Sequence, residues 1–163
     1  MAEHFQPRPA VRAILVAQPE QRVLLIHTWI PDTQKLIWLA PGGGLEGDED
    51  PKMGLYREVE EETGLIPQQA FGPVWRRRQK FHLHGKAFDQ SEAFYYVPVK
   101  MFEPDNSANP AVAERDIFRG FRWWSLDEIK AATDEIFVPL TFADHLQKLL
   151  EEGVPTQAYD VGR

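Results

Sequence analysis

Three glutamates near the middle of the chain have the residue type and spacing of a metal site. Glu58, Glu61 and Glu62 fall within roughly a 100° arc of an α-helix, because successive helical residues advance by about 100°. They follow the glycine run Gly42–Gly44, and carboxylates beside glycine carbonyls are oxygen ligands that Mg²⁺ and Mn²⁺ prefer. Most runs of glutamate are solvated helix faces, so the cluster alone leaves both interpretations open.

The predicted helix carries these carboxylates where an isolated helix disfavours them. Asp50 and Pro51 are typical of a helix start, and Gly64 is typical of a helix end. The glutamates therefore lie in the last half of the helix, where the macrodipole disfavours each anion by about 0.3–1 kcal/mol. Residues that break a local structural preference in this way are usually found at functional sites. A bound cation would offset the unfavourable charge of the glutamates.

The spacing of the residues around the cluster is more specific than the glutamates themselves. The pattern is Gly43, five residues, Glu49, seven residues, then Arg57-Glu58-Val59-x-Glu61-Glu62-x-Gly64-Leu65. This pattern resembles the signature of the Nudix hydrolase family. One departure is Gly54, where relatives commonly have alanine; because glycine costs about 1 kcal/mol inside a helix, we expect close backbone packing there.

The resemblance implies roles for the residues of the pattern. Glu61 and Glu62 resemble the family's main metal ligands, joined by Glu58 and by the backbone carbonyl of Gly43. Arg57 resembles the arginine that pairs with the early glutamate, here Glu49, and so orients the acidic cluster. Members of the family hydrolyse a diphosphate linked to another group, most often a nucleoside. The resemblance therefore implies a Mg²⁺-dependent or Mn²⁺-dependent pyrophosphohydrolase with a small nucleotide-type substrate.

The pattern does not identify the base that activates water. Some relatives take this base from a glutamate in a later loop, and Glu114 lies near the end of the comparable segment 101–116. Glu58 is the alternative base. A different hypothesis is a non-catalytic module of the same fold that senses a nucleotide. Loss of one or more of the three glutamates would favour it, and all three are present.

Candidate substrate contacts lie on a predicted hairpin downstream. In segment 70–83, alternation puts Arg76 and Arg78 on one face, which either holds substrate phosphates or is solvated. Glu92 lies in an aromatic row of the returning strand, and an unpaired buried carboxylate is costly. Glu92 therefore either reaches the metal or substrate, or pairs with an arginine of the neighbouring strand.

Three aromatic residues on predicted strands are candidates for stacking on a base. They are Trp75, Trp38 and Phe88. Aromatic residues on strands commonly belong to the core, so core packing is the alternative for each.

Composition excludes several classes of protein. The 163 residues are 43% hydrophobic and predict a single domain. The net charge of −7 argues against DNA binding and general membrane affinity, which need a positive surface. No long apolar segment predicts a membrane span, and the absence of cysteine fits a reducing compartment. We expect a cytoplasmic protein and leave a homodimer open.

The remaining patterns predict a mixed sheet between helices. This agrees with the α/β fold that the resemblance implies, a Nudix-like α/β/α sandwich with a mixed central sheet. The terminal segments 1–9 and 154–163 are expected to be loose. Periodicity, capping and turn residues predict strands at 10–17, 22–29, 36–40, 70–83, 86–97 and 118–124, and helices at 51–63, 125–132 and 141–152.

Overall fold

The helices and strands lie close to the positions that local sequence patterns predict. A computed structural model describes residues 2–110 and 116–163. In chain order the elements are β1 (Gln6–Ala17), β2 (Arg22–Ile30), β3 (Lys35–Leu39), β4 (Gly42–Gly44), α1 (Pro51–Thr63), β5 (Phe71–Leu83), β6 (Lys86–Val99), β7 (Phe118–Ser125), α3 (Leu126–Ala131), α4 (Phe142–Glu152) and β8 (Tyr159–Asp160). Across the described residues, none of these helices combines the length and the apolar character that crossing a membrane requires.

An eight-stranded mixed sheet forms the centre of the molecule. Its strands follow the order β3-β2-β1-β6-β5-β8, while β4 pairs with β1 and β7 with β2. The β1–β2 and β5–β6 pairs are antiparallel, as expected for hairpins, whereas β1 runs parallel to β6. The parallel pair brings residues 6–17 beside residues 88–99. Side chains distant in the sequence therefore share one part of the sheet.

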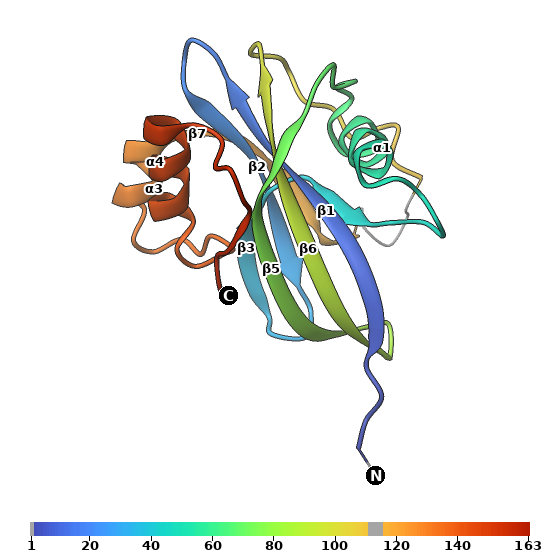
Figure 1. The fold of residues 1–163 in the computed structure, drawn as a ribbon. Helices are drawn as coiled ribbons and strands as arrows, with labels where there is room; N and C mark the ends of the chain where they lie inside the picture. The colour runs from blue at the N-terminus through green and yellow to red at the C-terminus, as the bar shows by residue number, and fades with distance from the viewer. Residues whose placement is uncertain (1, 111–115) are drawn as a thin grey trace.

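Helices cover both faces of the sheet, which confirms the predicted sandwich (Figure 1). On one face, Leu55 and Val59 of α1 pack against β1, β2 and β6. On the other face, Ile129 of α3 and Phe142 and Leu146 of α4 belong to a second apolar cluster. Each such side chain contributes roughly 1.5–3 kcal/mol when fully buried. Apolar packing against the first face thus holds α1 in a defined place on the sheet.

Local interactions fix the two ends of α1 at the predicted residues. The Asp50 carboxylate accepts backbone hydrogen bonds from Lys52 and Met53, and Pro51 is the first helical residue. Gly64 ends the helix with a φ of 81°, a conformation that glycine adopts without steric cost. The acidic cluster therefore lies on one rigid element.

The expected close packing at Gly54 is confirmed. A Cβ at this position would lie 2.4 Å from Leu45 Cδ2 and 2.8 Å from Glu49 Oε1. The helix thus approaches the segment that precedes it more closely than a larger residue would allow. This contact explains why a residue with poor helix propensity occupies the middle of α1.

Both ends of the chain pair with the sheet, so the expectation of loose segments at 1–9 and 154–163 was wrong in this respect. β1 already begins at Gln6. At the other end β8 pairs with β5, and the Val161 N–H donates a hydrogen bond to the Arg76 carbonyl. Val161 is also buried in the core. The polar side chains of the tail predicted that it would be exposed and loose. Strand pairing, however, uses backbone N–H and C=O groups, which are present whatever the side chains are.

Candidate active site

The glycine strand β4 lies against the acidic face of α1. The Gly42 N–H donates a hydrogen bond of 2.9 Å to Oε2 of Glu62. Glu58 is 7% exposed, and a Cβ on Gly43 would lie 2.8 Å from its Oε1. Because a side chain at position 43 would displace this carboxylate, glycine is required for the contact. The helix and the glycine strand therefore form one structural unit.

Arg57 links this unit to the segment that precedes the helix. Its Nε and Nη2 donate to the two carboxylate oxygens of Glu49, at 2.8 and 3.0 Å, so the predicted pair is present and bidentate. Its Nη1 also donates to Glu58 at 3.2 Å and to Glu61 at 3.4 Å, and Nη2 donates to the Gly44 carbonyl at 3.3 Å. One guanidinium thus donates to three carboxylates and the glycine strand, and its Nη1 also forms an ion pair of 3.5 Å with a fourth carboxylate, that of Glu46.

The Glu49–Arg57 pair predicts a contribution to stability that is lost in acid. The hydrogen bond from Arg57 lowers the pKa of Glu49 to about 2, from 4.5 for an ordinary glutamate. A carboxylate with a lowered pKa stabilises the fold above its unfolded-state pKa, and this contribution disappears as the pH falls through the folded-state pKa. We expect the free energy of unfolding to decline between about pH 4.5 and 2, and less steeply in Glu49→Gln. Urea unfolding across this range measures both slopes, and equal slopes would contradict the assignment.

The acidic cluster fits a divalent cation in donor type and charge. Three carboxylates and the nearby Gly43 backbone provide oxygen ligands, which Mg²⁺ and Mn²⁺ prefer. Within residues 2–110 and 116–163, no three His, Asp or Glu groups converge as a formed metal site would. Glu58 and Glu61 instead accept hydrogen bonds from Arg57. The buried Glu58 carboxylate lies close to Gly43, the residue whose backbone carbonyl is another expected ligand.

Glu92 pairs with arginines, which is one of the two alternatives left open by the sequence. It is 3% exposed and accepts hydrogen bonds from Nη1 of Arg77 on β5 and, at 2.5 Å, from Nε of Arg12 on β1. Burial alone would raise the pKa of Glu92, but the two guanidinium groups hold that pKa below its ordinary value. Glu92 is therefore charged in the fold, and its oxygens are used by these two arginines.

Arg12 is a residue near the site that sequence reasoning missed. Its Nη1 donates to the Ala40 carbonyl at 3.0 Å, just before the glycine strand. Although burial opposes the charge, the carboxylates of Glu92, Glu62 and Glu58 raise the pKa of Arg12 above its ordinary value. The available signal was an arginine inside an otherwise apolar predicted strand. Such a residue requires a buried partner.

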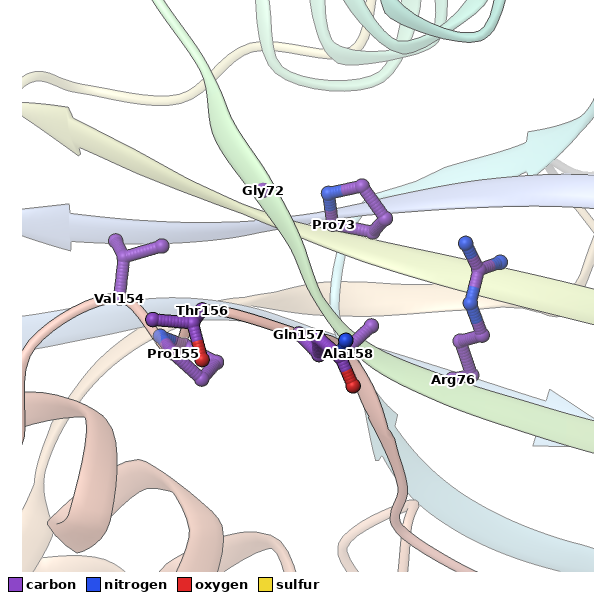
Figure 2. A pocket seen from close by; sticks show the side chains of 8 residues that line it. All are labelled: Gly72, Pro73, Arg76, Val154, Pro155, Thr156, Gln157 and Ala158. Atoms are coloured by element: carbon purple, nitrogen blue, oxygen red, sulfur yellow. The ribbon is translucent and has the colours of Figure 1, made fainter.

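The basic face of β5 lies away from the acidic cluster. Arg78 is exposed and forms a two-point hydrogen-bonded pair with Asp89. Arg76 lines a cavity of about 580 Å³. Figure 2 shows its lining residues, which come from the start of β5 and from segment 154–158. The predicted contacts of Arg76 and Arg78 with substrate phosphates therefore gain no support from their positions.

Two of the three aromatic candidates are buried in the core, and the third, Phe88, is half-buried. Trp75 is 1% exposed and contacts the ring of Phe142 at 5.7 Å. Trp38 is buried and stacks on His27 at 4.1 Å, and Phe88 contacts another phenylalanine. Core packing therefore accounts for Trp75 and Trp38. Glu114, the candidate base, lies outside the described residues, so its role stays a prediction.

A cavity of about 420 Å³ opens beside the acidic cluster. It is smaller than the cavity in Figure 2, but carboxylates and two arginines line it, which makes it the better candidate for phosphate chemistry. Its walls are formed by Arg8, Gly44, Leu45, Glu46, Arg57, Glu58, Glu61 and Pro110. The residues of the sequence pattern thus border a space that could receive a ligand.

The chain is similar in sequence to known hydrolases over about half of its length. The chain is 28% identical over 104 residues to Nudix hydrolase 25 of Arabidopsis thaliana, covering 56% of this chain and 59% of that protein. It is 34% identical over 89 residues to an RNA pyrophosphohydrolase of Stenotrophomonas maltophilia, covering 52% of this chain and 39% of the relative. The chain thus spans about half the length of these two relatives.

A solved structure and a family model extend the similarity over most of the chain. The crystal structure of a MutT protein from Methanosarcina mazei has the same fold, with a TM-score of 0.62 and 22% identity over 94% of this chain and 100% of that one. The model of the NUDIX domain matches residues 6–144 and so includes the acidic helix, the glycine strand and the sheet that carries them. The chain therefore belongs to the NUDIX family.

Proposed function

We propose that this protein is a pyrophosphohydrolase that uses Mg²⁺, or Mn²⁺, to cleave the diphosphate linkage of a nucleotide-type substrate. The observation that supports this most strongly is the unit of α1 and β4, in which Glu58, Glu61 and Arg57 border the cavity and Glu62 contacts the glycine strand. The similarity to proteins named Nudix hydrolase and RNA pyrophosphohydrolase supports the same reaction class.

The proposed mechanism divides the work among a few residues. Glu61 and Glu62, joined by Glu58 and the Gly43 carbonyl, would hold the cation, and Arg57 keeps the cluster oriented. When bound, the cation supplies neutralising charge to the diphosphate oxygens and lowers the pKa of water. Either Glu58 or Glu114 accepts the proton of the water that attacks one phosphorus atom. The opposite P–O bond breaks, which releases two phosphate-bearing fragments.

A substrate panel with product identification tests the proposal. The purified protein is incubated with Mg²⁺ and a nucleoside triphosphate, a dinucleoside polyphosphate, a nucleotide sugar or an RNA with a 5′-triphosphate. We expect at least one of these to yield two phosphate-bearing products, and EDTA to abolish the reaction. Binding of a nucleotide without any hydrolysis across the panel would instead support the non-catalytic sensing module.

Metal binding also predicts a change in stability that needs no substrate. A cation that binds only the native state raises the free energy of unfolding by about 2.7 kcal/mol at about 100 times its Kd. We expect the melting temperature to rise with Mg²⁺ or Mn²⁺ concentration, and to rise less in a Glu61→Gln variant. A melting temperature that is independent of both cations would contradict a metal site at the acidic cluster.

A further inference from the structure

Arg12 of β1 and Arg77 of β5 share a single buried carboxylate, that of Glu92. All three side chains are largely removed from water. Two guanidinium groups and one carboxylate leave this buried charge group with one excess positive charge. Because a buried charge is costly unless an opposite charge lies near it, the excess requires a further anion in the surrounding structure.

The two guanidinium groups differ in the anions that surround them. Burial lowers the pKa of Arg77 below its ordinary value, and the charges that act on Arg77 are those of Glu92 and Arg12. Burial also opposes the charge of Arg12, yet the pKa of Arg12 is raised above its ordinary value. The carboxylates that raise it are those of Glu92, Glu62 and Glu58. The excess positive charge therefore acts on the acidic cluster from the position of Arg12.

Backbone contacts fix the position of Arg12 relative to Glu62. Arg12 pairs with Gly42 in the antiparallel ladder of β1 and β4, and the Gly42 N–H donates a hydrogen bond to Glu62. A Cβ on Gly42 would lie 2.0 Å from the Val11 carbonyl oxygen and 2.7 Å from Arg12 Cα, so only glycine allows the two backbones to approach this closely. The Arg12 Nη1 also donates to the Ala40 carbonyl, just before the glycine strand. This short segment thus connects Arg12 to a carboxylate of the acidic cluster.

A fixed positive charge beside carboxylates has two opposite effects on a divalent cation that binds them. It keeps the carboxylates ionised, as metal ligands must be. It also repels the cation, and the repulsion by a unit charge is twice as large for a divalent cation as for a monovalent one. Arg57 already donates to the carboxylates of Glu58 and Glu61, so their ionisation does not depend on Arg12. The main effect of Arg12 on a bound cation is therefore repulsion.

We propose that Arg12 weakens the binding of a divalent cation at the acidic cluster, by adding a fixed positive charge beside the glycine strand, and so keeps the cation exchangeable. This inference rests on the proposed function for the location of the cation. Arg12 sets the affinity of the site without being a ligand of the cation. A purely structural role, in which Arg12 only anchors the Ala40 carbonyl, predicts the opposite sign, because a disturbed site binds the cation less tightly.

Binding of Mn²⁺ in the absence of substrate tests the sign of this effect. We would titrate the wild type and Arg12→Gln with Mn²⁺ at neutral pH, measure free Mn²⁺ by electron paramagnetic resonance, and add Mg²⁺ as a competitor. We expect Arg12→Gln to bind both cations about three- to tenfold more tightly, since the repulsion by one unit charge is lost. Glutamine still offers an N–H donor to Glu92, which also stays paired with Arg77. Unchanged or weaker binding by a folded Arg12→Gln would overturn the proposal.

Arg77→Gln is the matched control, and Arg12→Lys separates charge from shape. Arg77→Gln removes the same charge from the same buried carboxylate, but at a guanidinium whose charge acts on Glu92 and Arg12. It should change the cation affinity by less than about twofold, and equal tightening in both glutamine variants would refute the role of Arg12. Arg12→Lys keeps the charge and loses the fork of donors, so it should bind the cations as the wild type does. If Arg12→Gln does not fold, Arg12→Lys still decides, because a loss of affinity there would support the structural role.

The titration distinguishes failure of this inference from failure of the proposed function, because it requires no catalysis. A wild type that binds neither cation would refute the metal site, and both proposals with it. A wild type that binds them with an affinity that does not depend on the charge at position 12 would refute this inference alone. Tighter binding by Arg12→Gln, with no hydrolysis in the substrate panel, would refute the hydrolase and retain the role of Arg12.

Discussion

Replacing Glu62 with glutamine is expected to lower kcat for Mg²⁺-dependent diphosphate hydrolysis by about 10²–10³-fold. Glu62 is a proposed metal ligand, and a catalytic cation provides several kcal/mol of transition-state stabilisation, with each 1.36 kcal/mol equal to a factor of ten. Glutamine keeps the shape of the side chain and an oxygen that can accept the hydrogen bond from Gly42. The glycine strand should therefore stay in place while one ligand charge is lost.

Glu60→Gln is a matched control on the same helix. Glu60 is exposed and points away from the acidic face, and its replacement removes the same charge from the same half of α1. We expect unchanged kcat in this variant, with a small gain in stability because one anion leaves the unfavourable end of the helix dipole. The measurement is steady-state kinetics at several Mg²⁺ concentrations. Undiminished turnover in Glu62→Gln, or equal losses in both variants, would refute the role of Glu62.

Features that depend on nearby residues could be predicted from the sequence. The limits of α1 follow from Asp50, Pro51 and Gly64, all of which act within one turn of the helix ends. The capping box of Ser125 and Glu128 at α3 is equally local, and both of its hydrogen bonds are present. The carboxylates of the acidic cluster were located for the same reason, because a single helix carries them.

Features that depend on the order of strands could not be predicted in this way. The partners of Glu92 come from β1 and β5, and Arg12 is 80 residues away in the sequence. Alternation predicted that Glu92 would face an interior surface. The hairpin pairing with β5 sets Arg77 opposite it, but only the parallel pairing of β1 with β6 brings Arg12 to it. The same pairing places Arg8 at the cavity. The charged residues that lie on strands of the sheet were therefore the ones whose partners sequence reasoning missed or left open.

Replacing Glu92 with glutamine is expected to destabilise the fold by about 3–5 kcal/mol, because it leaves two buried guanidinium groups without their anion. The side chains of Arg12, Arg77 and Glu92 are 13%, 6% and 1% exposed, so water cannot take the place of the carboxylate. For a domain of this size the melting temperature should fall by roughly 6–20 °C. Asp89→Asn removes a carboxylate from the same strand, where it pairs with the exposed Arg78, and should change the melting temperature little.

A second substitution separates the loss of charge balance from a loss of packing. Arg77→Met removes one of the two cations and keeps an unbranched apolar side chain, so in the Glu92→Gln background it should restore part of the lost stability. In the wild-type background the same substitution should be destabilising, because Glu92 then loses one of its partners. Chemical unfolding of the wild type, both single variants and the double variant gives the coupling energy directly. Additive effects would show that the buried charges do not stabilise one another and that Glu92 supports the sheet by its shape alone.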